Sequence, residues 1–348
     1  MILLETSVFI RTIRIIRNMS KKKTKKKNLP KGLPEKFVER LKEIVGSANF
    51  SVIETTFVDR PTTFRVNTLK ATKAEIKEYL DERGFKTRSV PWYSDAFILE
   101  GNKTKRDLTE QSIYAEGKIY IQSLASMVPP LVLDPKPGEK ILDLTAAPGS
   151  KTSQMAALMG QNGELVANEL NKVRFFRLKA NMEILGVDKG KDDWQFILRM
   201  EDGSVLSEEY PGYFDKILLD APCSGESRFI DGYPKSYGFW SEHKIKETAY
   251  RQQKLLLASW HALKPGGILV YSTCTIAPEE NESRISKLLE RVGDEAEIQS
   301  IELPLLKILP PVMSWREREY HKDIKKTLRI FPTKDIEGFY VAKIKKRG

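Results

Sequence analysis

The chain has 348 residues, two of them cysteines, and carries 58 Lys and Arg against 47 Asp and Glu, for a net charge of +11. This length is enough for one large α/β domain and a smaller one, and two cysteines are too few for a disulfide framework. No apolar stretch is long enough to span a bilayer. We therefore expect a cytoplasmic protein without a membrane partner.

The positive charge is concentrated at the two ends of the chain. Residues 1–50 and 301–348 hold most of the excess, while residues 51–300 carry a small net negative charge. A face that binds a nucleic acid on the body of the protein must therefore be local.

Residues 1–32 are predicted to be a disordered basic arm. Residues 21–27 hold six lysines and nothing apolar to bury, so this stretch either attracts phosphates or only solubilises the chain. Residues 1–18 are apolar, with arginines three positions apart. That pattern fits either a targeting presequence or an upstream start codon with Met19 as the first residue, and both interpretations stay open.

Residues 33–115 predict a small α+β domain, because short alternating and helical patterns follow one another without a long buried strand. The expected elements are helices over 34–45 and 73–83 and strands over 64–69, 85–90 and 96–99. The second helix ends at Gly84, a residue suited to a helix C-terminus.

From residue 116 to the end, strands and helices alternate. After an opening segment over 119–133, the expected strands cover 140–145, 165–168, 194–199, 214–219, 267–273, 297–303 and 338–344, and the expected helices cover 151–159, 172–185, 243–263 and 279–292. Such alternation with right-handed crossovers predicts the α/β class, with a doubly wound, Rossmann-like sheet.

The strand–turn–helix segment over 141–152 indicates the kind of cofactor. It contains only Gly149 where a dinucleotide fingerprint needs three glycines, which disfavours a nicotinamide cofactor. Glu169 ends the next strand, where a carboxylate accepts both hydroxyls of a ribose. Asp202 follows the third strand and suits an adenine amino group. Each acid taken alone would read as a solvated loop residue, but together they predict S-adenosyl-L-methionine.

Both cysteines come just after apolar runs. Cys223 follows residues 216–219 and Cys274 follows residues 267–273, and ligands in an open α/β sheet lie outside the carboxyl ends of the strands. We therefore expect both thiols at one pocket, although a lone cysteine is more often a small buried hydrophobe.

A thiol at the pocket points to one kind of methyl transfer. Transfer to nitrogen or oxygen needs no thiol, whereas C5 of a pyrimidine is too electron-poor until a thiolate adds at C6. A base must later remove the C5 proton. The spacing of the two cysteines leaves open which one attacks.

These motifs resemble those of the Nol/Nop/Sun family of RNA cytosine-C5 methyltransferases, and especially the bacterial RsmF-type ribosomal RNA enzymes. The matching segments are 120–122, 142–143, 146–152, 168–169, 220–226 and 271–275, with 64–69 similar to the family's N-terminal module. One segment departs from the family: residues 227–230 stand where a glycine and a basic pair are usual, which leaves the choice of target open.

The resemblance implies a role for each matched residue. Cys274 would be the nucleophile, and Cys223 would assist release of the methylated RNA. Asp220 and Lys151 would hold the cytosine edge and the developing charge. The implied cofactor-binding residues are Ala146, Ala147, Pro148, Gly149, Ser150, Lys151, Glu169, Asp202 and Asp220. Residues 33–115 would bind RNA, and residues 116–348 would form the catalytic domain.

The expected partner is RNA, with ribosomal RNA favoured over transfer RNA, and a monomer is the default. A non-catalytic RNA-binding or ribosome-assembly protein on the same fold and an amino-group methyltransferase remain as alternatives. Trp240 is read as a packing residue, with base stacking as the alternative. The chain's histidines are His243, His261 and His321, and because their spacing fits no ligand set we expect no metal site.

Overall fold

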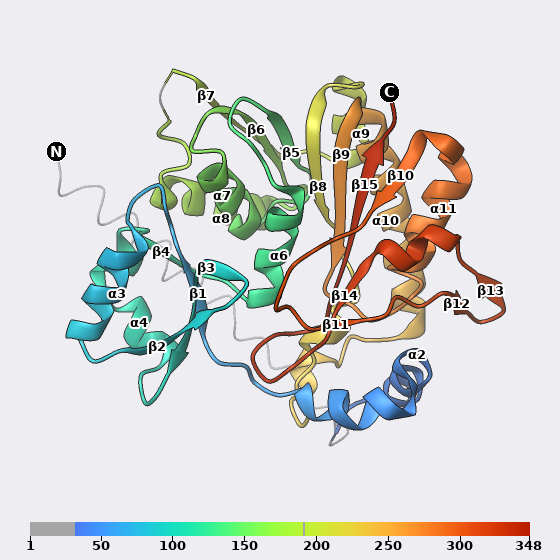
Figure 1. Ribbon diagram of the computed structural model, residues 1–348, viewed down its shortest axis with the longest axis horizontal. Coiled ribbons are helices and arrows are strands. Elements are labelled where there is room, and N and C mark those ends of the chain that lie inside the picture. The colour runs from blue at the N-terminus through green and yellow to red at the C-terminus, as the bar shows by residue number, and fades with distance from the viewer. Residues whose placement is uncertain (1–31, 191) are drawn as a thin grey trace.

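Two main sheets organise the computed structural model, which describes residues 32–190 and 192–348 (Figure 1). The arm predicted over residues 1–32 lies outside these residues, apart from Gly32. Within the described residues, no helix is both long enough and apolar enough to cross a membrane.

The larger sheet has the order β11-β14-β15-β9-β8-β5-β6-β7, and β10 pairs with β15. Its strands are β5 Lys140–Asp143, β6 Gly163–Asn168, β7 Trp194–Arg199, β8 Phe214–Asp220, β9 Leu263–Thr273, β10 Ala296–Gln299, β11 Ile308–Leu309, β14 Leu328–Ile330 and β15 Phe339–Lys346. Strands β5 to β9 are parallel, and β15 runs antiparallel beside β9. The strand order reverses between β5 and β8, where open α/β sheets bind ligands.

Helices cover both faces of this sheet. They are α6 Leu124–Leu133, α7 Ser150–Leu158, α8 Lys172–Leu185, α10 Glu242–Ala262 and α11 Glu282–Val292, with the short α9 Gly203–Leu206 before β8. Ile141 packs with α6, α7 and α8 on one face, whereas the next residue, Leu142, packs with α10 and α11 on the other. Because both faces are buried, the strands read as continuous apolar runs. The predicted doubly wound sheet is confirmed.

The smaller sheet has the antiparallel order β2-β3-β1-β4. Its strands are β1 Thr63–Val66, β2 Lys86–Val90, β3 Tyr93–Glu100 and β4 Ile119–Ile121, and its helices are α3 Lys73–Glu82, α4 Lys105–Thr109 and α5 Ser112–Ala115. The segment over 119–133 was expected to open the larger unit, but its first strand, β4, pairs with β1 instead. The reason is packing, because Ile119 joins the small core around Phe64 and Val66.

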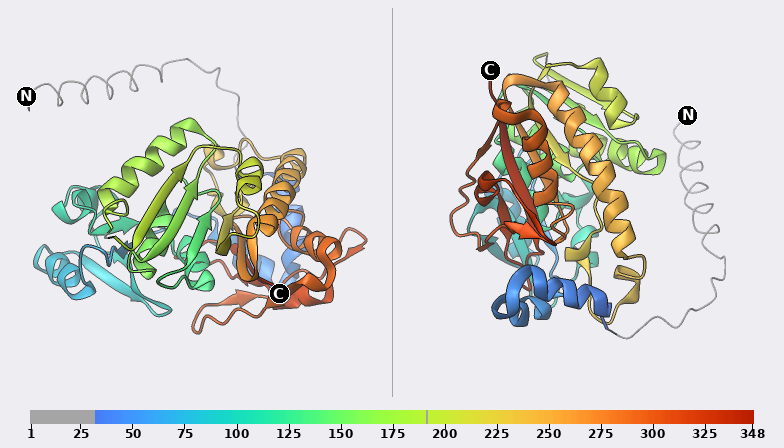
Figure 2. Two further views of the ribbon diagram at one scale, coloured as in Figure 1. Left: turned by 90° about the horizontal axis from the view of Figure 1, so that it is seen from above. Right: turned by 90° about the vertical axis from the view of Figure 1, so that its right-hand side faces the viewer.

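Helix α2, Glu35–Ile53, is longer than the predicted 34–45 and is interrupted at Gly46, whose φ is 74°. It packs away from the small sheet. The Phe37 ring contacts Phe229 and Trp240, which follow β8. In Figure 1 and in the right view of Figure 2 this blue helix lies at the lower end of the larger domain, beside the yellow loop after β8.

Arg65 on β1 joins the two domains and is fully buried. Its Nε donates to Gln122 Oε1 at 2.9 Å, and its Nη2 donates to Ser153 Oγ at 2.6 Å and to the Ser150 carbonyl at 3.3 Å. Both serines lie in the first turn and a half of α7, the helix that carries Lys151. The small domain therefore helps to hold the start of α7 in place.

Replacing Arg65 with leucine should lower the free energy of unfolding by about 2–4 kcal/mol, because it leaves buried acceptors without a donor. The control is Arg106→Leu, since the Arg106 side chain is 86% exposed in an ion pair with Glu110. That change should cost no more than about 0.5 kcal/mol. Urea denaturation measures the free energy of unfolding of both variants. Equal losses would show that buried Arg65 contributes no more to stability than exposed Arg106.

Candidate active site

The two cysteines leave the sheet side by side. Strands β8 and β9 are parallel neighbours in a register that pairs Asp220 with Ser272. Cys223 and Cys274 follow these strands at the same edge, and their Sγ atoms lie 3.3 Å apart as free thiols. The sequence predicts this juxtaposition, since the carboxyl ends of parallel strands meet at one edge.

The surroundings of the two thiols differ. A hydrogen bond from the Cys223 thiol lowers the pKa of Cys274, and the Arg228 guanidinium acts in the same direction against the effect of burial. The same hydrogen bond, together with burial, raises the pKa of Cys223 well above its usual value. The opposite shifts and the Arg228 charge favour the thiolate at Cys274, and the thiolate is the nucleophilic form of cysteine.

A buried carboxylate, Glu280, ties the two cysteine turns together. Its Oε1 accepts hydrogen bonds from the Ser224 backbone N–H at 2.9 Å, Thr248 Oγ1 at 2.5 Å and Gln252 Nε2 at 3.1 Å. Ser224 Oγ donates to its other oxygen and lies 2.8 Å from Thr275 Oγ1. Ser224 follows one cysteine and Thr275 follows the other, so this network fixes the distance between the thiols.

A second buried carboxylate, Glu226, extends the network. It accepts hydrogen bonds from Thr275 Oγ1 at 2.9 Å and from Trp240 Nε1 at 2.8 Å. Burial raises the pKa of Glu226, and it raises that of Glu280 to about 7. Sequence reasoning missed both roles, because the only local signal is a glutamate shortly after each cysteine.

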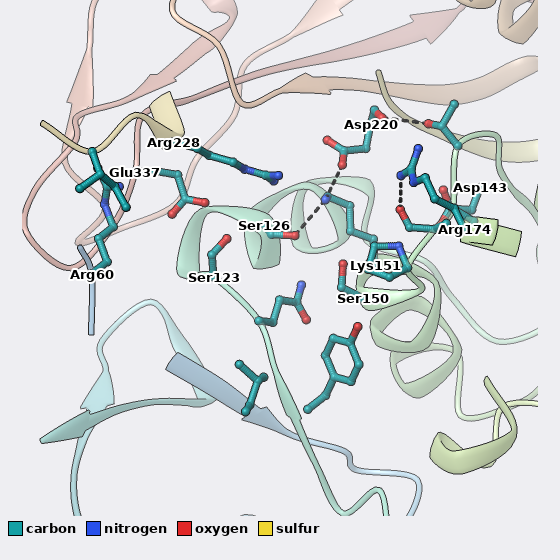
Figure 3. Close-up of a pocket in the computed structure, with 18 of the residues that line it drawn as sticks. Arg60, Ser123, Ser126, Asp143, Ser150, Lys151, Arg174, Asp220, Arg228 and Glu337 are labelled. Atoms are coloured by element: carbon teal, nitrogen blue, oxygen red, sulfur yellow. Dashed lines mark hydrogen bonds and ion pairs between the residues drawn. The ribbon is translucent and has the colours of Figure 1, made fainter. Parts of the chain in front are cut away.

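Lys151 and Asp220 form an ion pair at the switch point of the sheet (Figure 3). Lys151 Nζ lies 2.6 Å from Asp220 Oδ2 and 2.9 Å from Ser126 Oγ, and Ser272 Oγ donates to the other oxygen of Asp220 at 2.9 Å. Nearby, Asp143 accepts a hydrogen bond from Thr152, and burial raises its pKa to about 7. Lys151 is thus held by Asp220, an acid that Ser272 positions and that lines the same cavity as the two thiols.

Two adjacent cavities meet at this ion pair. The thiol cavity, of about 530 Å³, contains both cysteines, Glu169 and Asp202. The interdomain cavity, of about 480 Å³, lies between the small domain and the start of α7. The residues that line both cavities are Thr145, Arg174, Asp220 and Arg228.

The predicted cofactor residues divide between these cavities. Glu169 and Asp202 line the thiol cavity, Ala146, Ala147, Pro148, Ser150 and Lys151 line the interdomain cavity, and Asp220 lines both. Gly149 lines neither. Its φ is +102°, and a Cβ there would lie 2.4 Å from the Met182 side chain, so glycine is needed for the turn and for packing against α8.

Glu169 gives a test of whether a nucleoside fits. Its Oε1 accepts from the Asn171 backbone N–H at 2.9 Å. Its buried Oε2 accepts no hydrogen bond, although Arg174 Nη1 lies 3.1 Å away as an ion-pair partner. A buried oxygen with a free lone pair on the wall of a cavity suits a ribose hydroxyl. Asp202 is exposed at the same cavity, where it caps α9 through Ser204. The residues fit a nucleoside cofactor.

Comparison with known proteins gives the class and then the family. The family of 16S rRNA methyltransferase RsmB/F matches residues 130–345, and the N-terminal domain of 16S rRNA methyltransferase RsmF matches residues 33–124. Together with the doubly wound sheet, these matches define an S-adenosylmethionine-dependent methyltransferase. The chain belongs to the RsmB/F family of RNA cytosine-C5 methyltransferases, which confirms the resemblance found in the motifs.

Two relatives show how far the likeness extends. The tRNA (cytosine(49)-C(5))-methyltransferase of Pyrococcus abyssi is 39% identical over 316 residues, which are 89% of this chain and 96% of that protein. The ribosomal RNA small subunit methyltransferase F of Vibrio campbellii is 38% identical over 285 residues, which are 81% of this chain. The chain spans only 56% of that second relative.

Solved structures share the fold over most of the chain. A methyltransferase homolog protein from Pyrococcus horikoshii superposes with a TM-score of 0.77 at 33% identity, covering 90% of this chain and 95% of that one. The structure of NSun6 from Pyrococcus horikoshii with SFG gives a TM-score of 0.74 at 22% identity, with 90% and 98% covered.

Replacing Glu280 with glutamine should change how stability depends on pH. The folded pKa of about 7 lies above the usual 4.5, so the stability that the protonated carboxyl contributes is present below pH 4.5 and is lost as pH rises through 7. Between pH 5 and 8 the free energy of unfolding of wild type should fall relative to that of Glu280→Gln, by up to about 3 kcal/mol. Urea denaturation across this range measures the difference. A difference that stays constant with pH would contradict the raised pKa.

Proposed function

We propose that this chain methylates C5 of a cytosine in structured RNA, with Cys274 as the nucleophile and Cys223 as the group that frees the product. The observation that carries the proposal is the 3.3 Å separation of the two thiols at a cavity that also presents Glu169 and Asp202. A reducing compartment such as the cytoplasm keeps such thiols free.

The proposed cofactor is S-adenosyl-L-methionine, which when bound supplies an electrophilic methyl group. Glu169 would hold its ribose hydroxyls, because its buried Oε2 has an unused lone pair. Asp202 would accept from the adenine amino group at the far side of the same cavity. The segment over 146–151 and Asp220 would close the site on the side of the reacting atoms.

The chemistry of the substrate follows from the two thiols. The Cys274 thiolate would add to C6 of the cytosine, forming an S–C6 bond and moving the C5=C6 electron pair so that C5 becomes nucleophilic. Lys151 and Asp220 would hold the polar edge of the base and balance the charge that develops there. C5 would then accept the methyl group as its bond to the cofactor sulfur breaks, leaving the cofactor as a neutral thioether. Cys223, as its thiolate, would take the C5 proton, and the S–C6 bond would break to restore C5=C6 and release Cys274.

The hydrogen bond to Cys274, burial and the negative charge of Cys274 raise the pKa of Cys223, which keeps it protonated in the free enzyme. Once the Cys274 sulfur is bonded to C6 that charge is gone, so Cys223 would lose its proton to water and could then act as the base. The cytosine must leave its stack to reach these groups, and unpaired loops make this least costly. We therefore propose a loop or bulge of a folded RNA as the substrate.

Ribosomal RNA stays the predicted substrate, and transfer RNA is the second candidate. The observation that favours transfer RNA is that the tRNA methyltransferase relative matches over 316 residues at 39% identity, against 285 residues at 38% for the ribosomal one. Both relatives act on RNA according to their names, which supports RNA as the partner.

The two cysteines should respond differently to replacement by alanine. Cys274→Ala should abolish transfer of a tritiated methyl group to RNA, because no thiolate adds to C6. Cys223→Ala should accumulate a covalent RNA–protein adduct that survives denaturing electrophoresis, since the C5 proton is not removed. Full activity of Cys274→Ala would overturn the proposed mechanism.

Bisulfite sequencing of total RNA should identify the substrate. Cells with the gene deleted should lose 5-methylcytosine at one or a few positions, and a plasmid carrying wild type, but not Cys274→Ala, should restore it. Loss in ribosomal RNA supports the first candidate, and loss in transfer RNA supports the second. No change in any RNA, together with tight RNA binding, would instead indicate a non-catalytic binding protein.

A further inference from the structure

The mouth of the thiol cavity carries two exposed aromatic rings. Phe239 is 61% exposed and Tyr250 is 63% exposed, and both line this cavity together with Arg251 and Lys254. We call these four residues the aromatic rim. Exposed aromatic side chains that gather beside a functional cavity mark binding surfaces.

Phe239 is held in place by its neighbours. Tyr237 is buried, and the Gly238 N–H donates to the Pro234 carbonyl at 2.7 Å. On the other side, Trp240 donates to Glu226 and packs its ring against Phe37, 5.8 Å between centroids. Trp240 is therefore a packing residue, and it presents Phe239 to solvent in a fixed position.

Tyr250 stands on the outer side of α10. The neighbouring Ala249 and Gln252 are buried against the domain, whereas Tyr250 and Arg251 face outwards. Lys254 lies one turn further along, with its Nζ 4.7 Å from the centre of the Tyr250 ring. The helix thus displays an aromatic ring and two cations at the mouth of the cavity.

We propose that the aromatic rim binds the unpaired nucleotides that flank the target cytosine. Phe239 and Tyr250 would stack on bases, and Arg251 and Lys254 would pair with phosphates, a combination typical of sites for single-stranded nucleic acid. This inference rests on the proposed function. It adds that the catalytic domain binds the RNA on either side of the target cytosine, in addition to the RNA binding proposed for the small domain.

The occupant follows from the position and chemistry of the rim. A cytosine that enters the thiol cavity brings its neighbours to the mouth of that cavity, because the RNA backbone links them. Phosphates complement the charge of Arg251 and Lys254, and base faces complement the two rings. The rings are more than half exposed, which leaves them free to stack on a base.

The test compares Phe239→Ala and Tyr250→Ala with a matched control, Phe176→Ala. Phe176 is also exposed, at 53%, but lies on α8 outside both cavities. Each rim variant should raise the RNA Kd about 10-fold, the usual effect of losing one stacked base. The control should bind RNA within twofold of wild type. Filter binding with the identified RNA gives the Kd, and circular dichroism verifies that each variant is folded.

The affinity for the cofactor shows whether the aromatic rim binds RNA or instead covers the bound cofactor. Isothermal titration with S-adenosylmethionine should give the same Kd for wild type and both rim variants. Weaker cofactor binding with unchanged RNA binding would overturn the inference. Phe239→Trp, unlike Phe239→Ala, should bind RNA as tightly as wild type, because tryptophan keeps an aromatic face.

The two cations give an independent readout. Replacing Arg251 and Lys254 with alanine should lower the slope of log Kd against log salt by about one for each phosphate that the variant no longer binds. An unchanged slope would overturn the pairing of these two cations with phosphates. If wild type methylates no RNA, the proposed function is wrong. If wild type is active but the rim variants bind RNA normally, only the proposed role of the aromatic rim is wrong.

Discussion

The contact between Cys223 and Cys274 is the feature on which the rest of the site depends. It exists because β8 and β9 are parallel neighbours in register, and because Ser224, which donates to Glu280, also lies 2.8 Å from Thr275 in the other cysteine turn. Burying a carboxylate is costly unless its oxygens are well bonded. Burial raises the pKa of Glu280 to about 7 even though four hydrogen bonds reach its carboxyl group, and these bonds join the loop after β8, α10 and the turn after β9.

The small domain contributes to the geometry of that unit. Arg65 reaches from β1 to the first turn and a half of α7, which carries Lys151, and Lys151 in turn pairs with Asp220 at the end of β8. At the opposite end, Phe37 of α2 packs on the loop that follows Cys223. The N-terminal third of the chain therefore supports the groups proposed for catalysis from two sides.

Much of the fold is predictable from local patterns. The helix over 172–185 and the strand over 194–199 match α8 and β7 residue for residue, because their flanking turns and apolar residues are unambiguous. The prediction for 119–121 was wrong about the sheet that it joins, since a three-residue apolar strand fits either core. The predicted helix over 34–45 ends where α2 is broken at Gly46, and the helical segment that follows up to Ile53 was not predicted.

The sequence by itself determined the class of the protein: apolar runs followed by turns establish the parallel sheet, and the thiols after two such runs indicate the chemistry. Only the tertiary structure shows that the pKa of Cys274 is lowered, because this shift depends on Cys223 and Arg228 from the segment after β8. The hydrogen bonds of Glu280 and Arg65 and the position of the aromatic rim are likewise visible only in the tertiary structure. Burial and electrostatic fields come from residues far apart in the chain, and a local pattern carries no record of them.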